Sequence, residues 1–142
     1  MNKVNFEGTT TSSLGFGTSL LTRNSCISDA LSNLEMAFEH GITHFDCAKL
    51  YGYGHAEKIL GKFAKNKRQL ITITSKSGLY SRNLPLAILP IVNMCRKVTK
   101  LAPSRKNLNG AFPKLGVFNP KNLICDIDSS LRSMSTEYMD FY

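Results

Sequence analysis

The sequence lacks an apolar run long enough to cross a bilayer. The longest candidate, Leu84 to Val92, contains two prolines and is much shorter than the roughly 20 apolar residues that a transmembrane helix needs. The opening segment, MNKVNFEGTT, contains no apolar core of a secretory signal. We therefore predict a protein that does not enter a membrane and stays in the cytoplasm.

Cysteine pairs at metal-binding spacing are also absent. None of the four cysteines belongs to a CxxC motif, which favours reduced thiols in a cytoplasm: Cys26, Cys47, Cys95 and Cys125. His40 and His44 are four residues apart, but Gly41 predicts that a helix ends between them. The two imidazoles would then not share the helix face that a zinc site of this spacing requires. We predict no metal site.

Acidic residues are missing from a long central segment. No Asp or Glu occurs from Lys58 to Cys125, although this segment holds 14 of the 18 Lys and Arg in a chain of net charge +8. Such a segment could attract a phosphate-bearing partner, either a dinucleotide or a nucleic acid. We favour an ordinary solvated surface, because the basic residues alternate with apolar segments and few aromatic residues lie among them. Nucleic-acid binding is therefore not expected.

What the chain does contain is an alternation of strand-like and helix-like segments, which predicts an α/β fold with a parallel sheet. Its 142 residues, 42% of them hydrophobic, suffice for one domain over residues 1–142. Strands are expected at residues 14–19, 43–46, 70–75 and 138–142. Helices are expected from an N-cap at Ser28 to a stop at Gly41, over residues 56–64, and from Pro120 after the N-cap Asn119. The last helix should present one apolar face: Leu123, Ile127, Leu131 and Met134.

The alternation fails between residues 77 and 119. This segment contains four of the five prolines, Pro85, Pro90, Pro103 and Pro113. A long connection inside a compact domain is usually functional or disordered. An apolar stretch predicts one helix after Pro90, so we expect a long excursion with some structure of its own.

Three polar residues lie where catalytic groups gather in βα folds. Asp46 ends the second expected strand, Tyr51 follows it in a loop, and Lys76 ends the third expected strand. The C-terminal ends of parallel strands meet at one face of a βα barrel. A free phenol is a poor acid at neutral pH, but a nearby ammonium stabilises the phenolate, and a carboxylate can hold that ammonium in place. Each residue alone is usually structural. Together the three are suited to proton transfer to an oxygen that becomes negative, as when a carbonyl accepts hydride, and their sequence context decides between the two interpretations.

The context of these residues resembles the signature of the aldo-keto reductases. It reads D-x-x-x-x-Y-G-x-G-x-A-E-x-x-L-G from Asp46, after G-I-x-x-F, and is followed by a strand that ends in Lys76. The segments GFGTS and DIDSSLRSMSTEYMDFY resemble the family's first strand and its later helix and strand. The resemblance implies the N-terminal half of a (β/α)8 TIM barrel, with about four βα strands and a long excursion after the third.

The same resemblance implies an oxidoreductase that reversibly reduces a small aldehyde or ketone to an alcohol, without a metal. Tyr51 would be the general acid, Lys76 would tune its acidity, and Asp46 would pair with Lys76. The cofactor would be NADP (as NADPH) or NAD. Its nicotinamide half would lie against four residues: Gly17, Thr18, Ser19 and Asp46. Cys47 departs from the usual Thr or Ala after the catalytic Asp but keeps a small side chain.

The family's fourth catalytic residue, a His after the next strand, would fall just past Tyr142, as would the loops that bind the rest of the cofactor. We therefore expect an incomplete barrel domain that is inactive alone, because losing one of several cooperating groups costs orders of magnitude in rate. Its unpaired sheet edges predict instability or self-association. The alternative is a non-catalytic remnant or a regulatory or binding subunit on the reductase scaffold, with the basic segment 77–121 as a docking surface.

Overall fold

The structure, a computed structural model, describes residues 1–22, 26–80, 85–88, 91, 114–115 and 119–142. Its strands are β1 (Lys3–Phe6), β2 (Thr9–Ser12), β3 (Gly15–Gly17), β4 (His44–Asp46), β5 (Thr72–Thr74), β6 (Leu79–Tyr80) and β7 (Lys114–Leu115). Its helices are α1 (Ile27–Glu39), α2 (Ala56–Ala64) and α4 (Pro120–Met134). Three short 3-10 turns are η1 (Tyr51–Gly54), η2 (Arg68–Leu70) and η3 (Leu86–Ile88).

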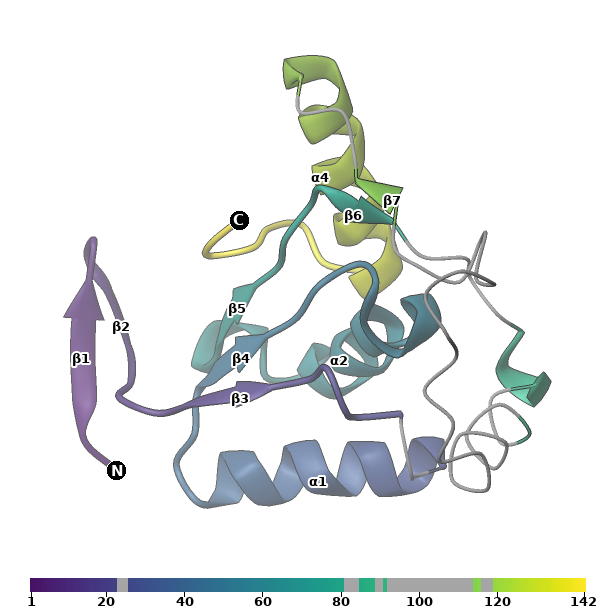
Figure 1. The fold of residues 1–142 in the computed structure, drawn as a ribbon. Coiled ribbons are helices and arrows are strands. Elements are labelled where there is room, and N and C mark those ends of the chain that lie inside the picture. Colours follow the sequence, from purple (N-terminus) through teal and green to yellow (C-terminus); the bar gives the residue numbers. More distant parts are fainter. Residues whose placement is uncertain (23–25, 81–84, 89–90, 92–113, 116–118) are drawn as a thin grey trace.

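The central element is a three-stranded parallel sheet in the order β3-β4-β5 (Figure 1). In its register, His44 lies opposite Gly15 on one side and Thr72 on the other. The connections contain α1 between β3 and β4, and α2 between β4 and β5. This arrangement confirms the predicted alternation and the parallel sheet.

One face of this sheet packs on the helices and forms the core. Phe45 and Ile73 are fully buried, and so are Leu34 of α1 and Leu60 of α2. The rings of Phe45 and Phe63 lie 5.0 Å apart between centroids. Full burial of a side chain of this size is worth about 1.5–3 kcal/mol. These contacts fix the sheet against the helices and thereby set where the strands end.

A β-hairpin that sequence reasoning missed precedes the sheet. β1 and β2 pair in antiparallel fashion, and the two residues between them, Glu7 and Gly8, have φ values of 50° and 81°. Two successive residues at positive φ form the turn that suits a two-residue hairpin. Hydroxyl groups join the hairpin to the sheet, since Thr11 Oγ1 and Thr72 Oγ1 share a buried hydrogen bond of 2.7 Å. Figure 1 shows the hairpin beside the end of the sheet where the strands begin.

The helix ends agree with prediction at two of three positions. Gly41, at φ +86°, follows α1 and confirms the predicted stop, because a glycine adopts this conformation without strain. Asn119 caps α4 as predicted, and its Oδ1 accepts the Asn122 N–H at 2.8 Å. The predicted N-cap at Ser28 is wrong. Cys26 occupies that position, and its Sγ shares a 2.7 Å hydrogen bond with Ser28 Oγ.

The buried face of α4 differs from the predicted apolar face. Asp126, Ser130 and Met134 are the buried residues of this helix, whereas Leu123, Ile127 and Leu131 are half-buried. Asp126 faces the loop after β4, where Lys49 donates to it at 2.8 Å. Ser130 Oγ is buried without a hydrogen-bond partner in the described part of the chain. A polar stripe therefore replaces part of the expected apolar contact.

The expected fourth strand is reduced to one bridge. Of residues 138–142, only Phe141 forms a β-bridge, which is parallel and joins it to Thr74. One residue earlier, the Asp140 carboxylate accepts the N–H of Ile73 at 2.8 Å. A side chain thus takes the place of a backbone partner at this edge of β5, which shortens the pairing.

The long excursion expected after the third strand contains a short antiparallel strand pair in its described part. β6 and β7 pair in antiparallel fashion, so residues 79–80 and 114–115 lie side by side. The helix expected after Pro90 lies outside the described residues. Within the part of the chain that the structure describes, no helix combines the length and apolar character needed to span a membrane.

Gly61 allows the close contact between α2 and α4. A Cβ built on Gly61 would lie 2.6 Å from Met134 Cα and would overlap Met134 O. We expect Gly61→Ala to lower the free energy of unfolding by about 1–3 kcal/mol, since the helices must move apart, although Gly to Ala usually stabilises a helix. Urea unfolding followed by circular dichroism measures the change. Lys62→Ala, on the exposed side of the same helix, is the control and should have little effect; a stabilised Gly61→Ala variant would contradict the contact.

Candidate active site

Asp46 and Lys76 form an ion pair where β4 and β5 end. Lys76 Nζ donates to Asp46 Oδ1 and, at 3.1 Å, to the carbonyl oxygen of Cys47. Thr18 holds the backbone of Asp46, because its N–H and its Oγ1 donate to the Asp46 carbonyl at 2.9 and 3.0 Å. Parallel pairing of β3, β4 and β5 therefore brings residues from three strand ends to one place.

Tyr51 joins this pair from the turn η1. Lys76 Nζ lies 5.3 Å from the centre of the Tyr51 ring, within the range of a cation–π contact. After Tyr51 the backbone takes left-handed values, with φ of 57° at Gly52, 56° at Tyr53 and 87° at Gly54. A Cβ on Gly52 would also approach Thr22 Oγ1 to 2.6 Å. The glycines of YGYG thus shape the loop that presents Tyr51.

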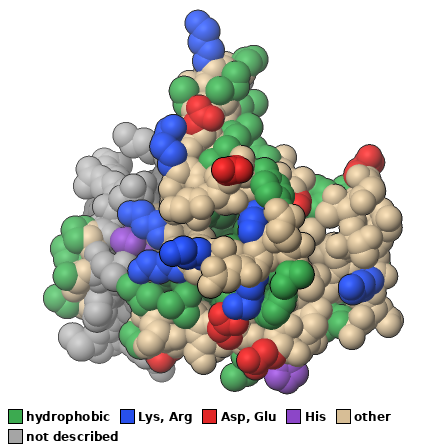
Figure 2. Space-filling model, turned by 180° about the vertical axis from the view of Figure 1, so that it is seen from behind, with side chains coloured by type: hydrophobic (Ala, Val, Ile, Leu, Met, Phe, Trp, Pro, Cys, Tyr) green, Lys and Arg blue, Asp and Glu red, His purple; other side chains and the backbone are tan. Residues whose placement is uncertain are grey.

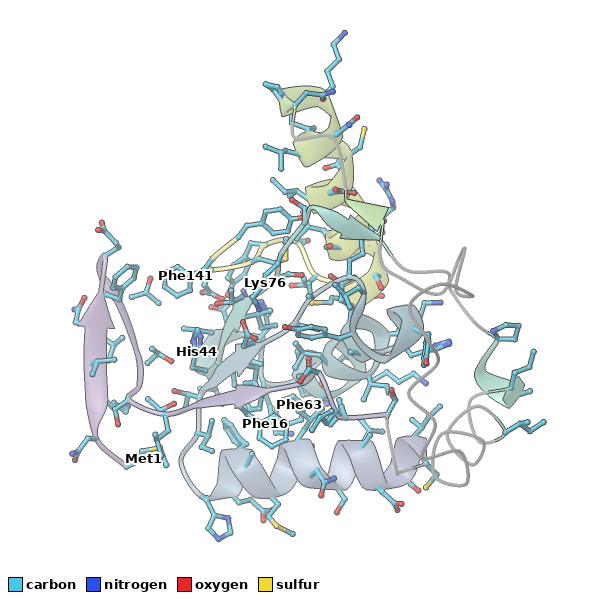
Figure 3. All side chains as sticks on the ribbon, in the orientation of Figure 1. Met1, Phe16, His44, Phe63, Lys76 and Phe141 are labelled. Atoms are coloured by element: carbon cyan, nitrogen blue, oxygen red, sulfur yellow. The ribbon has the colours of Figure 1, made fainter. Side chains whose placement is uncertain are left out.

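The ion pair is accessible from solvent. The side chain of Lys76 is 46% exposed and that of Asp46 is 34% exposed. Figure 3 shows Phe16 pointing toward α1, whereas His44 and Lys76 lie on the other side of the strands. A small molecule can therefore approach the amine and carboxylate from the face of the sheet that the helices leave uncovered.

The residues predicted to contact the cofactor divide into two kinds. Gly17 and Ser19 are exposed, and nothing lies within 4 Å of a Cβ built on Gly17. Thr18 is fully buried, and its hydroxyl is engaged by the Asp46 carbonyl. Open space therefore lies over Gly17, which pairs with Asp46 in the sheet, while the Thr18 side chain holds the strand ends together.

The side chain of Cys47 is fully buried next to the ion pair of Asp46 and Lys76. The pKa of its thiol is raised to about 12 from 9.0, chiefly by burial and to a smaller extent by the carboxylates of Glu57 and Asp46, while hydrogen bonds with Thr18 and Ala48 oppose the rise. A thiol reacts only as the thiolate. Lys76 donates to the backbone carbonyl oxygen of Cys47 and not to its side chain. Substitution of the thiol would therefore leave this hydrogen bond in place.

We expect Cys47 to resist alkylation while the chain is folded. At mildly alkaline pH its thiolate should be about three orders of magnitude scarcer than that of an ordinary cysteine. Cys26 and Cys125 are exposed and serve as internal controls in the same sample. Peptide mass spectrometry after timed iodoacetamide treatment should show early labelling at these two and labelling of Cys47 only in denaturant. Equal rates in the folded chain would contradict this burial.

Because the folded thiol holds its proton more tightly, its contribution to stability is present below pH 9.0. It is lost as the pH rises toward 12, where the unfolded chain is already deprotonated.

Two polar pairs near the site were not predicted. The buried carboxylate of Glu57 accepts from Ser75 Oγ at 2.8 Å. Lys49, in the loop between Asp46 and Tyr51, pairs with Asp126 of α4 at 2.8 Å. The only sequence signal for Glu57 was its place in the A-E-x-x-L-G pattern. No local signal joins Lys49 to Asp126, because they lie 77 residues apart.

Two predictions remain, one on the distribution of charge and one on metal binding. Figure 2 shows Lys and Arg side chains spread over one face with Asp and Glu side chains between them. Most of the basic segment 77–121 lies outside the described residues, so its interpretation stays a prediction. Among the described residues, no cluster of three or more His, Cys, Asp or Glu could hold a metal ion.

The fold is similar to solved aldo-keto reductases. An aldo-keto reductase of Bacillus halodurans in its holo form superimposes with a TM-score of 0.66 at 23% identity, over 99% of this chain and 39% of that one. A glycerol dehydrogenase of Gluconobacter oxydans gives 0.66 at 21% identity, over 97% and 37%. Proteins of this family are (β/α)8 barrels, and the present chain folds like part of one.

Sequence comparison agrees. A probable aldo-keto reductase of Glycine max is 39% identical over 88 residues, which is 58% of this chain and 25% of that protein. A pyridoxal 4-dehydrogenase of Microbacterium luteolum is 35% identical over 79 residues, or 54% and 23%. The matches thus span about a quarter of these relatives. The model of the Aldo/keto reductase family matches residues 13–142, and the chain belongs to this family.

Proposed function

We propose that residues 1–142 form the N-terminal half of a (β/α)8 barrel that reduces a small aldehyde or ketone to an alcohol, reversibly and with NADPH or NADH. The observation that carries the proposal is the position of the Lys76 amine, between the carboxylate of Asp46 and the ring of Tyr51. The order β3-β4-β5, followed by the bridge at Phe141, supports the barrel. A cytoplasmic location fits the free thiols of the described cysteines.

In this proposal Tyr51 donates the proton. Its hydroxyl protonates the substrate oxygen as that oxygen becomes negative, and the product is an alcohol. The ammonium of Lys76 stabilises the negative charge that this transfer leaves on the phenol oxygen. Asp46 keeps the ammonium in place through the ion pair, while Thr18 fixes the backbone of Asp46. In the reverse direction the tyrosine oxygen accepts the proton from the alcohol.

The exposed loop after β3 fits a dinucleotide at this site. The open space over Gly17 and the exposed Ser19 adjoin Asp46, whose carbonyl oxygen is already bound by Thr18. Gly17, Ser19 and the Asp46 side chain would hold the nicotinamide end. When bound, NADPH or NADH supplies the hydride. Either NADPH or NADH is compatible with this proposal, which assigns residues only to the nicotinamide end.

The test compares two proteins with an aromatic aldehyde and either NADPH or NADH. One is the chain of residues 1–142, and the other is the product of the whole reading frame that contains them. We expect cofactor oxidation, followed by absorbance, and formation of the alcohol only with the second protein. If a folded product of the whole frame binds cofactor but reduces no aldehyde or ketone, the non-catalytic alternative takes the place of this proposal.

A further inference from the structure

The buried carboxylate of Glu57 has no part in the chemistry proposed above. It is 2% exposed and belongs to the first turn of α2. Burial of a carboxylate is costly unless hydrogen bonds compensate it. The first turn of a helix favours a negative group, because the backbone N–H groups there are unpaired. Glu57 can therefore remain buried as a hydrogen-bond acceptor.

The partner of Glu57 lies next to the catalytic candidate Lys76. Ser75 is fully buried, and its Oγ donates to Glu57 Oε1 at 2.8 Å. Its N–H donates to the carbonyl of Phe141 at 3.2 Å. Successive side chains along an extended segment point to opposite faces. Glu57 thus holds the end of β5 from the helix side, while Lys76 reaches Asp46 on the other side.

We propose that Glu57 is a positioning residue for Lys76, which acts through Ser75 to fix the backbone from which the lysine reaches Asp46 and the Cys47 carbonyl. The inference rests on the proposed function for its catalytic meaning. The placement itself does not, because it concerns a contact within this chain. The same carboxylate also raises the pKa of the Cys47 thiol.

The placement can be measured on residues 1–142 without any assay of reduction. Trace acetylation with acetic anhydride over a series of pH values, read by peptide mass spectrometry, reports the reactivity of each lysine. In the unaltered chain Lys76 should react more slowly than Lys62, which is exposed on α2, because the Lys76 amine is engaged by the Asp46 carboxylate and the Cys47 carbonyl oxygen.

Three variants separate the hydrogen bond from other effects. Ser75→Ala removes the donor, and Glu57→Leu removes the acceptor with little change in volume. Either should raise the acetylation rate of Lys76, relative to Lys62, by roughly fivefold, the change expected for one lost hydrogen bond. Glu57→Gln keeps an acceptor for Ser75 Oγ, so it should restore a rate close to that of the unaltered chain.

A control for general loosening is Leu60→Ala, which removes a fully buried side chain of the same helix and leaves the hydrogen bond between Ser75 and Glu57 intact. It should leave the relative rate of Lys76 unchanged. The proposal is overturned if Leu60→Ala raises that rate as much as Ser75→Ala, or if Ser75→Ala leaves it unchanged. Should Glu57→Leu fail to fold, Ser75→Ala and Glu57→Gln still decide. An inactive whole protein would refute the proposed reaction and leave these rates as they are.

Discussion

Replacing Asp140 by alanine is expected to lower the free energy of unfolding by about 3–5 kcal/mol, the usual cost of removing one partner from a buried ion pair. Asp140 Oδ2 accepts from Arg68 Nη2 at 2.7 Å and from the N–H of Ile73 at 2.8 Å. The side chains of Arg68 and Asp140 are only 12% and 15% exposed. Asp140→Ala therefore leaves a guanidinium and a backbone N–H without their acceptor.

The other contacts of Arg68 explain why its side chain cannot easily rearrange when Asp140 is replaced. Its Nη1 donates to the Ile71 carbonyl at 3.0 Å, its Nη2 donates to the Tyr138 carbonyl at 3.1 Å, and its guanidinium lies 3.7 Å from the centre of the Tyr138 ring. The same side chain thus joins β5 to the last segment of the chain. Once its counterion is gone, the guanidinium cannot turn to solvent without breaking these contacts.

A surface pair provides the comparison. Lys67 and Glu35 lie 2.9 Å apart, but the Glu35 side chain is 44% exposed, so Glu35→Ala should cost no more than about 1 kcal/mol. Urea unfolding of both variants measures the contrast. A double-mutant cycle with Arg68→Met isolates the pair, since the double variant should lose less than the sum of the single losses. Equal losses for Asp140→Ala and Glu35→Ala would show that the Arg68 pair is no stronger than a surface one.

The parallel sheet and the places of Asp46, Tyr51 and Lys76 were predictable because they depend on local patterns. The predicted bounds of α2, Ala56 and Ala64, agree with the structure. They were predictable because an apolar helical face and the strand that follows it restrict where the helix can begin and end. The left-handed turn after Tyr51 places glycine, which adopts this conformation without strain, at two of its three positions, and Tyr53 at the third. Each of these features is settled within a few residues of chain.

The features that prediction missed depend on contacts between distant segments. The Asp140 carboxylate takes the place of a backbone acceptor for Ile73, so the expected strand at 138–142 forms a single β-bridge, at Phe141. Asp126 lies on the buried face of α4 because Lys49 reaches it from the loop before Tyr51. Glu57 is buried because Ser75, just after β5, donates a hydrogen bond to its carboxylate. Periodicity assigns such polar residues to solvent, and only the tertiary fold shows their partners.

The hairpin was missed for a different reason. β1 contains no buried residue, and β2 buries Thr11 and Ser12, so the alternation of apolar and polar residues that indicates a strand is absent. Its available signals were the β-branched residues around Glu7-Gly8. The hydroxyl of Thr11 bonds to Thr72 rather than to an apolar surface, and hydropathy does not detect a contact of this kind.

Tyr51→Phe is expected to lower kcat/KM for aldehyde reduction by about 10²–10⁴-fold in the product of the whole reading frame, the range that a general acid contributes. The ring remains under the Lys76 amine, so the fold and the affinity for NADPH, measured by titration, should stay close to those of the unaltered protein. Tyr138→Phe removes a hydroxyl from a tyrosine that stacks on Arg68, and it should keep its activity.

Lys76→Met tests whether the two residues act as a unit. It should cause a loss of similar size, and the double variant Tyr51→Phe with Lys76→Met should be little worse than either single variant, because cooperating groups are not additive. Multiplied losses would mean that the amine acts independently of the phenol. A Tyr51→Phe protein within a few fold of the unaltered rate would assign the proton to another donor, and the ion pair of Asp46 and Lys76 would then serve to hold the ends of β4 and β5 together.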